Sequence, residues 1–293
     1  MEIPHRTAAV RKQKSFPILL LIFVAALVHA QVVAPEPMRE QGNSVTGAFE
    51  GWFKNSDGTF SLLLGYYNRN QKQEVDVPIG PLNRIEPGGP DRGQPTHFVP
   101  GRGWGVFAVK VPADFGENRI TWTLTANGKT TVIPASLKTE YEIAPFREAS
   151  VGNTPPSLKF AETGPSVQGP QGLIVDRTAK TGTPLAIAAW IADDGKYTSN
   201  SGARPKVLPP AVTLHWAQYR GPAPVAFSEL TPAVEGPTAT IGTPFTGKAT
   251  TTVTFPQPGE YMLHVTANDF SGIGGSGFQC CWTTALIRVK VEQ

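Results

Sequence analysis

Cysteine is nearly absent from this sequence: of its 293 residues only Cys280 and Cys281, which are neighbours, carry a thiol. Neighbouring cysteines cannot join distant segments, so no long-range disulfide can hold a domain together. The disulfide-rich class of small secreted domains is thereby excluded. Each folded part of the chain must be stabilised by its own apolar core.

Long hydrophobic runs are also missing, apart from residues 16–28. This run is shorter than the ~20 residues that a transmembrane helix needs. Four basic residues precede it, and Val28-His29-Ala30 ends it with a small-x-small cleavage signal. These features predict a signal peptide at residues 1–30 and a secreted chain, extracellular or periplasmic, that starts at Gln31. The alternative is an uncleaved membrane anchor; the lack of cysteine after the cleavage point argues against a lipid anchor.

Clustered positive charge is lacking once the leader is removed. The first 30 residues hold four of the 26 basic residues and one of the 23 acidic residues, which leaves 22 of each sign. No stripe of Lys and Arg interleaved with aromatic residues remains, so nucleic-acid binding is disfavoured. We also expect no membrane insertion after cleavage of the leader.

Segments with helical periodicity are lacking too. Gly and Pro make up about a fifth of the chain and separate short runs rich in Thr, Val, Ile and aromatic residues. This composition is typical of an all-β protein. We expect two β-sandwich domains, the C-terminal one Ig-like. Their limits are a flexible segment at 31–44, an N-terminal sandwich at 45–146, a linker at 147–156 and a C-terminal sandwich at 157–293.

The N-terminal half contains a clear strand at residues 119–126. Ile120, Trp122 and Leu124 alternate with threonines there, and Asn127-Gly128 gives a hairpin turn signal. Residues 78–105 are dense in Gly and Pro. We expect a long loop in this region, and long loops in compact domains are often functional or mobile.

The C-terminal half can be divided into strands of an Ig-like sandwich. Tyr261 follows the Pro258-Gly259 turn, at the place of a tyrosine corner, and Trp216 fits the buried tryptophan of strand C. The expected strands are 184–193 (B), 212–219 (C), 249–255 (E), 261–268 (F) and 285–291 (G).

Several segments in this half resemble a PKD (polycystic kidney disease) repeat, over about half of the chain. They are Asn153-Thr-Pro-Pro156, Asp193-Asp-Gly195, Leu214-His-Trp-Ala-Gln-Tyr-Arg-Gly-Pro222, Val225-Ala-Phe227 and Ala267-Asn-Asp269. The resemblance implies an Ig-like extracellular sandwich used for adhesion, spacing or ligand presentation. Residues 195–210 and 270–283 are longer connections than the family's pattern has. The N-terminal half is similar to uncharacterised secreted bacterial proteins, which implies no activity.

Catalytic motifs are missing from the sequence. It has no Gly-x-Ser-x-Gly elbow and no His-Glu-x-x-His helix, although a glycosidase pair of distant carboxylates stays open. His215 and His264 are expected to point outward from neighbouring strands. We interpret these two histidines as a surface pair rather than a metal site. We expect that the protein is not an enzyme.

Oxygen-bearing side chains gather where strands B and F end. Asp193 and Asp194 follow the first strand, and Asn268 and Asp269 follow the second. Because the loops after these strands share one end of an Ig-like sandwich, the four side chains are candidate Ca²⁺ ligands. The alternative is that each caps its own turn. We expect no other cofactor.

Two tryptophans are candidates for stacking on a ligand. Trp190 is out of phase with its strand's inward residues, and Trp104 lies in the glycine-rich loop. Trp122, Trp216 and Tyr66 fit core positions instead. The alternative for the two candidates is that they cover sheet faces or an interface between domains.

The two cysteines predict a vicinal disulfide. Neighbouring Cα atoms lie about 3.8 Å apart across a trans peptide, less than the ~4.4–6.8 Å of ordinary disulfides. An oxidising compartment nevertheless favours the bond between Cys280 and Cys281. We expect a rigid knuckle beside Phe278 and Trp282 that contacts a partner. Buried free thiols and intermolecular pairing are the alternatives.

The sequence therefore indicates a secreted, non-enzymatic protein for binding or adhesion. Its partner would be an extracellular protein or a polysaccharide. The first alternative is a carbohydrate-binding protein or hydrolase accessory, and the second is a spacer without a ligand.

We predict that the exported protein starts at or near Gln31, because the leader has the three regions of a cleaved signal. N-terminal sequencing of the exported protein measures this directly. An intact N-terminus in the membrane fraction would reverse the assignment.

Overall fold

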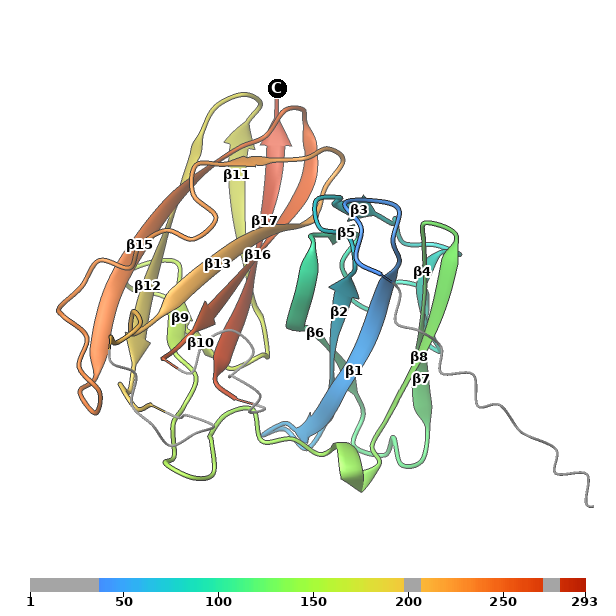
Figure 1. The fold of residues 1–293 in the computed structure, drawn as a ribbon, viewed down its shortest axis with the longest axis horizontal. Helices are drawn as coiled ribbons and strands as arrows, with labels where there is room; N and C mark the ends of the chain where they lie inside the picture. The colour runs from blue at the N-terminus through green and yellow to red at the C-terminus, as the bar shows by residue number, and fades with distance from the viewer. Residues whose placement is uncertain (1–36, 198–206, 271–279) are drawn as a thin grey trace, which may run out of the picture. The chain divides into compact units, whose positions relative to one another are not determined.

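A computed structural model describes residues 37–197, 207–270 and 280–293, and residues 37–293 form one compact unit. Within the described ranges the chain is built of β-strands, with one short 3-10 turn, η1 (Thr139–Tyr141) (Figure 1). The all-β prediction is confirmed. No helix in these ranges is long and apolar enough to cross a membrane. The predicted leader lies outside the described residues.

The N-terminal sandwich has two three-stranded sheets and a short strand pair. One sheet has the order β1-β2-β6 and the other β4-β7-β8, and β3 pairs with β5. The strands are β1 (Val45–Lys54), β2 (Phe60–Asn68), β3 (Val75–Asp76), β4 (Asn83–Glu86), β5 (His97–Phe98), β6 (Gly101–Val111), β7 (Arg119–Ala126) and β8 (Lys129–Ser136).

The core of this sandwich is centred on Trp122 of β7, which is fully buried together with Ile120 and Leu124. Its indole Nε1 donates a 2.9 Å hydrogen bond to Oδ1 of Asn83. The turn that follows has Asn127 and its neighbouring glycine at positive φ, as the hairpin signal requires. The alternation in the sequence therefore placed these side chains on the correct face.

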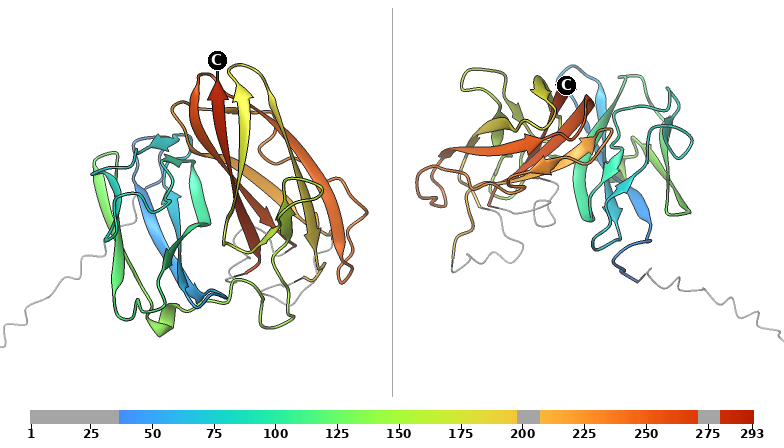
Figure 2. Two further views of the ribbon diagram at one scale, coloured as in Figure 1. Left: turned by 180° about the vertical axis from the view of Figure 1, so that it is seen from behind. Right: turned by 90° about the horizontal axis from the view of Figure 1, so that it is seen from above.

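The C-terminal sandwich packs a five-stranded sheet, β10-β9-β12-β15-β14, on a four-stranded sheet, β11-β17-β16-β13 (Figures 1 and 2). Strands β12, β15 and their neighbours form the B-E side of an Ig-like sandwich, and β13, β16 and β17 form the C-F-G side. The strands are β9 (Ser157–Lys159), β10 (Val167–Gln168), β11 (Leu173–Lys180), β12 (Leu185–Asp193), β13 (Thr213–Arg220), β14 (Ala226–Phe227), β15 (Phe245–Thr254), β16 (Gly259–Asn268) and β17 (Trp282–Glu292).

The five strands expected from the sequence correspond to β12, β13, β15, β16 and β17. Trp216 is buried in the core, and so is Tyr261. The hydroxyl of Tyr261 donates a 3.1 Å hydrogen bond to the carbonyl oxygen of Gln257, which is the bond of a tyrosine corner.

The N-terminal sandwich covers the outer face of the β13-β16-β17 sheet. Tyr219 is part of the N-terminal apolar core, and Met262 and Leu286 pack against that core. Arg220 forms a bidentate pair with Asp91, at 2.9 and 2.8 Å. The Gly- and Pro-rich region expected to be a long loop thus contains β4, β5 and part of this contact.

The described part of the segment expected to be flexible and the expected linker are both hydrogen-bonded. Asn43 and Ser44 are buried, and the amide nitrogen of Asn43 donates to Asn70. In the expected linker, Glu148 accepts hydrogen bonds from two backbone amides, and Asn153 donates to Asp269 at 2.6 Å. The bonds from Asn43 to Asn70 and from Asn153 to Asp269 could not be predicted from the sequence, because these partners are 27 and 116 residues apart.

We predict that Tyr261→Phe lowers the free energy of unfolding by about 1 kcal/mol, the usual worth of one net hydrogen bond. The phenyl ring keeps its packing, so only the bond to Gln257 is lost. Urea denaturation measures the change, with Tyr67→Phe on β2 as the matched control. An unchanged denaturation midpoint in Tyr261→Phe would show that the corner contributes no stability.

Candidate functional site

A cavity of about 140 Å³ lies between the covered sheet and the N-terminal sandwich. Residues of β2, β5, β6 and the segments flanking β5 line one side, and residues of β13, β16 and β17 line the other. The two walls come from segments far apart in the sequence.

Three residues that line this cavity carry buried polar atoms without a hydrogen-bond partner among the described residues. The atoms are Nε2 of His264, Oδ1 of Asn268 and Nε1 of Trp282. Asn268 and Trp282 are directly opposite each other on β16 and β17, and His264 lies four residues away on the same face of β16. Each such group costs about 1–3 kcal/mol when buried unpaired. Each of the three atoms has less than 1 Å² of accessible surface, so it lies inside the wall and does not face the cavity.

Aromatic side chains form much of the remaining wall. Tyr219 stacks on His264 with ring centroids 5.8 Å apart, and Tyr66 lines the same cavity. Trp104 also lines it and is 42% exposed, so its indole is accessible from outside. The guanidinium of Arg102 lies 4.2 Å from the ring centroid of Trp104.

A bulge in β6 brings Trp104 to this position. One residue of β2, between Leu64 and Tyr66, faces three residues of β6. Bulges of this kind bend a strand and redirect its side chains. Gly105 within the bulge has φ of +48°, and a Cβ there would lie 2.6 Å from the indole of Trp282. Glycine is therefore required for the backbone to approach the tryptophan so closely.

Glu50 fixes the bulge from the neighbouring strand β1. Its carboxylate accepts hydrogen bonds from the amide of Gly105 at 2.6 Å and from Arg102 at 2.5 Å. Burial raises the pKa of Glu50, while the charge and hydrogen bond of Arg102 oppose that shift. The arginine beside Trp104 is thus paired with a buried acid.

The histidines of the wall differ in charge. Burial alone would lower the pKa of His97, but hydrogen bonds and charges from Asp76 and Glu74 outweigh it and raise the pKa to about 9. Burial lowers the pKa of His264 to about 4; the nearby His215 adds to this, and a hydrogen bond to the backbone of Val106 opposes it. At neutral pH, His97 is charged and paired with two carboxylates, whereas His264 is neutral.

The interpretation of His215 and His264 as a surface pair was wrong for His264. This residue is buried, because the N-terminal sandwich covers its sheet face, whereas His215 is exposed at the same face. In the strand register, His215 is opposite Thr266 and His264 is opposite Ala217.

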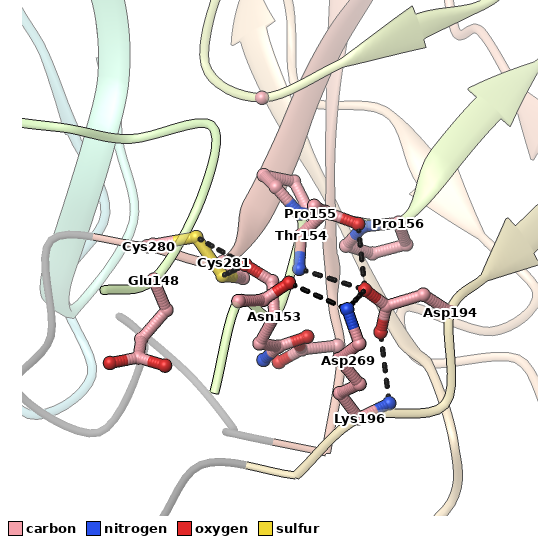
Figure 3. Close-up of a disulfide and its surroundings, with 12 residues drawn as sticks. Glu148, Asn153, Thr154, Pro155, Pro156, Asp194, Lys196, Asp269, Cys280 and Cys281 are labelled. Carbon is pink, nitrogen blue, oxygen red and sulfur yellow. Dashed lines mark hydrogen bonds and ion pairs between the residues drawn. A yellow bond between two sulfur atoms is a disulfide. The ribbon is translucent and has the colours of Figure 1, made fainter. Parts of the chain in front are cut away.

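The four candidate Ca²⁺ ligands do not form one cluster. Asp194 accepts hydrogen bonds from the hydroxyl of Thr154 and from the backbone amide of Lys196 (Figure 3). Asp269 accepts a hydrogen bond from the side-chain amide of Asn153. Asn268 lines the cavity on the outer face of its sheet instead. No group of three His, Cys, Asp or Glu within the described ranges could hold a metal ion.

Asp193 caps a turn, as the alternative interpretation expects. Its Oδ2 accepts a 2.8 Å hydrogen bond from the amide of Gly195. Burial, with a smaller contribution from the charges of Asp269 and Asp194, raises the pKa of Asp193 to about 7. The acids at this end of the sandwich are therefore engaged by turns and by the segment that joins the two sandwiches.

Cys280 and Cys281 are joined by a disulfide, and the peptide bond between them is cis. Both are buried, and Sγ of Cys281 lies 3.4 Å from the carbonyl oxygen of Asn153 (Figure 3). Trp282 is only 4% exposed, so the expectation that it contacts a partner from a protruding knuckle is wrong. It packs in a small core cluster with Phe53, Leu63 and Ile143. Phe278 lies outside the described residues.

Trp190 does not line the cavity. It is half-buried on β12, and Nζ of Lys248 lies 4.9 Å from its ring centroid. Trp190 covers its own sheet, whereas Trp104 is the one candidate of the two that reaches the cavity.

Sequence reasoning missed the cavity because it assigned the outward residues of strands C, F and G to solvent. A signal was present. Tyr219, Met262 and Leu286 are large apolar side chains in the outward phase of their strands, and an apolar outward face indicates a covering partner.

The comparisons with known proteins are sparse. No protein-family model matches the chain, and no curated protein matches it. Among solved structures, the chain is similar to domains 4 and 5 of the S-layer protein SbsC, with 11% identity and a TM-score of 0.23, covering 86% of this chain and 98% of that one. The fold assignment rests on strand order and register rather than on this similarity.

We predict that acid destabilises the protein through His264. Its folded-state pKa of about 4 lies below the ordinary value of 6.5, so its stabilising contribution is present above pH 6.5 and lost as the pH falls toward 4. The loss is on the order of 3 kcal/mol. Wild type should therefore lose stability relative to His264→Gln over this range.

Urea denaturation at several pH values measures this difference. His215→Gln is the comparison variant. Burial lowers the pKa of His215 as well, and His215 helps to lower the pKa of His264, so this variant should diverge from wild type, but less than His264→Gln does. Parallel pH profiles of wild type and His264→Gln would contradict the buried, neutral state of His264.

Proposed function

We propose that the chain is an exported, non-enzymatic binding protein that acts outside the cytoplasm, extracellular or periplasmic. Its binding site is the cavity between the two sandwiches. The observation that carries this proposal is a cavity with an aromatic wall, in which one of the lining aromatic side chains, Trp104, is exposed. Ligand sites in proteins have this character, with a few polar groups set in apolar and aromatic walls.

The state of the ionisable groups supports binding rather than catalysis. Arg102 is paired with Glu50, and His97 is paired with Asp76 and Glu74. A general base needs a pKa near the working pH, and the pKa of His264 lies about three units below neutrality. These groups are arranged to hold the wall together.

The resemblance of the C-terminal half to a PKD repeat supports a role in adhesion or ligand presentation. Its Ig-like strand order and tyrosine corner agree with that resemblance. In this proposal the partner is a molecule of the cell surface or its surroundings, either a protein or a polysaccharide.

A carbohydrate-binding or hydrolase-accessory function is the second candidate. The exposed indole of Trp104 at the cavity favours it, because aromatic faces pack well against sugar rings. The guanidinium of Arg102, which lies beside this indole, is paired with the carboxylate of Glu50. A surface without an unpaired charge suits an uncharged partner.

We predict that the exported protein is retained on whole cells or on insoluble polysaccharide, and that Trp104→Ala reduces this retention about tenfold or more, as the loss of a central aromatic contact does. Pull-down followed by quantitative blotting measures it. Trp190→Ala is the matched control, because that indole lies outside the cavity. Equal retention of wild type and Trp104→Ala would place the binding surface outside the cavity and overturn the site, whereas no retention at all would favour the spacer alternative.

A further inference from the structure

The size of the cavity limits its occupant. At about 140 Å³ it is close to the ~150 Å³ of an apolar cavity that stays dry and accepts one benzene ring. A ring with several hydroxyl groups needs more room than this, and so does a segment of a polymer chain. The occupant is therefore no larger than one ring with few or no substituents.

Aromatic side chains from both sandwiches line the cavity. Tyr66 and Trp104 come from the N-terminal sandwich, and Tyr219 and Trp282 come from the C-terminal one. The smaller apolar lining residues are Pro95, Val99, Pro100, Val106 and Ala217. Aromatic rings pack favourably edge-to-face or offset-stacked, which adds to the free energy of apolar burial. The wall therefore favours an aromatic ring over a saturated ring of the same size.

Several polar groups of the wall are already engaged within the protein. The hydroxyl of Tyr66 accepts a 3.2 Å hydrogen bond from the amide of Val99, and the hydroxyl of Tyr219 donates to a backbone carbonyl. The side-chain amide of Gln218 donates to one backbone carbonyl and accepts from one backbone amide, at 3.1 and 3.0 Å. The three unpaired atoms described above lie inside the wall and do not face the cavity.

Water inside the cavity would therefore be poorly bonded. The other uncharged polar groups of the described lining belong to Trp104, His215 and Thr266, and the first two of these residues are exposed. A buried water molecule needs about two to four polar partners. Because a poorly ordered water is displaced favourably by an apolar group, the cavity suits an apolar occupant.

The charges of the wall exclude an ionic occupant. His97 and Arg102 are each paired with carboxylates of this chain. Burial lowers the pKa of both His215 and His264, so these two rings are uncharged at neutral pH. Among the described lining residues no Lys, Asp or Glu and no further Arg is present. An ion brought into this cavity would lose its hydration without gaining a free countercharge.

The exposed lining residues mark the side from which a ring can enter. Trp104 is 42% exposed, whereas Tyr66, Tyr219 and Trp282 are buried. The guanidinium of Arg102 lies 4.2 Å from the ring centroid of Trp104 and holds the indole at this position. Little order therefore has to be created when a ring binds.

We propose that this cavity binds one uncharged aromatic ring of about the size of benzene, which enters past Trp104 and packs among Tyr66, Tyr219 and Trp282. This inference rests on the proposed binding function and names the ligand class of its site. The ring belongs either to a free aromatic molecule or to a phenylalanine side chain of a protein partner. In the second case it fills the cavity as an aromatic anchor fills a pocket at a protein interface.

The test uses the exported protein and small ring compounds in ligand-observed NMR and thermal denaturation. Benzene should bind with a Kd of about 1 mM or lower and should raise the melting temperature by mass action. Cyclohexane at equal concentration should bind severalfold more weakly. Benzoate should bind at least about tenfold more weakly, because its charge has no free partner in the wall.

N-acetyl-phenylalaninamide distinguishes the two sources of the ring. It carries the same ring on a peptide backbone. Binding of this compound as well as of benzene supports the side chain of a protein partner. Binding of benzene alone supports a free aromatic molecule.

Variants locate the bound ring. Ala217 lines the cavity and is half-buried on β13, so the larger side chain of Ala217→Ile occupies the cavity and should weaken benzene binding about tenfold or more. Ala188→Ile, which changes a half-buried alanine on β12, is the matched control and should bind as wild type. If Ala217→Ile does not fold, Trp104→Ala decides, because this exposed side chain forms part of the wall. It should weaken benzene binding about tenfold.

The outcomes separate this inference from the proposed function. Equal benzene binding by wild type and Ala217→Ile overturns the inference, and so does benzoate binding as tight as that of benzene. No binding of any ring by wild type overturns it as well; retention on cells that still depends on Trp104 would then leave the proposed function standing with another ligand. Ring binding that Ala217→Ile removes, without retention on cells or polysaccharide, supports the ring site and contradicts the proposed partner.

Discussion

The contact between the N-terminal sandwich and the outer face of β13-β16-β17 determines the rest of the site. Tyr219 enters the N-terminal core, and Arg220 pairs with Asp91 at the end of the same strand. This contact converts an outer sheet face into an interior wall. His264 is buried and neutral for that reason, and Trp282 belongs to a core although it starts the last strand. A single Ig-like sandwich without this cover would present the same side chains to water.

Close packing at the contact depends on local features of β6. The bulge next to Gly105 lets the backbone reach Trp282, while Glu50 bonds both Gly105 and Arg102. Buried acids usually have raised pKa values and are held by hydrogen bonds or charge partners. Glu50 follows that rule, so the bulge and its buried carboxylate support each other. The same arrangement leaves Trp104 exposed at the cavity.

The sequence predicted the fold well where the information was local. Alternation identified the strand with Trp122, and the Pro258-Gly259 turn before Tyr261 identified the tyrosine corner. It failed where the decisive partner was distant. Asn268 reads as a loop ligand beside Asp269, yet its side chain faces the other sandwich. Strand alternation distinguishes two faces of a sheet, but it does not say whether another domain covers the outer one.

The disulfide links the cavity to the segment between the sandwiches. Cys281 directly precedes Trp282, and its sulfur contacts Asn153 of that segment, which in turn bonds Asp269 at the end of β16. The start of β17 is therefore held at the covalent bond, at the connecting segment and at the neighbouring strand. A tryptophan restrained on these sides keeps its N–H in one place. The feature that looked in sequence like a contact loop is therefore part of the packing between the connecting segment and the sheet.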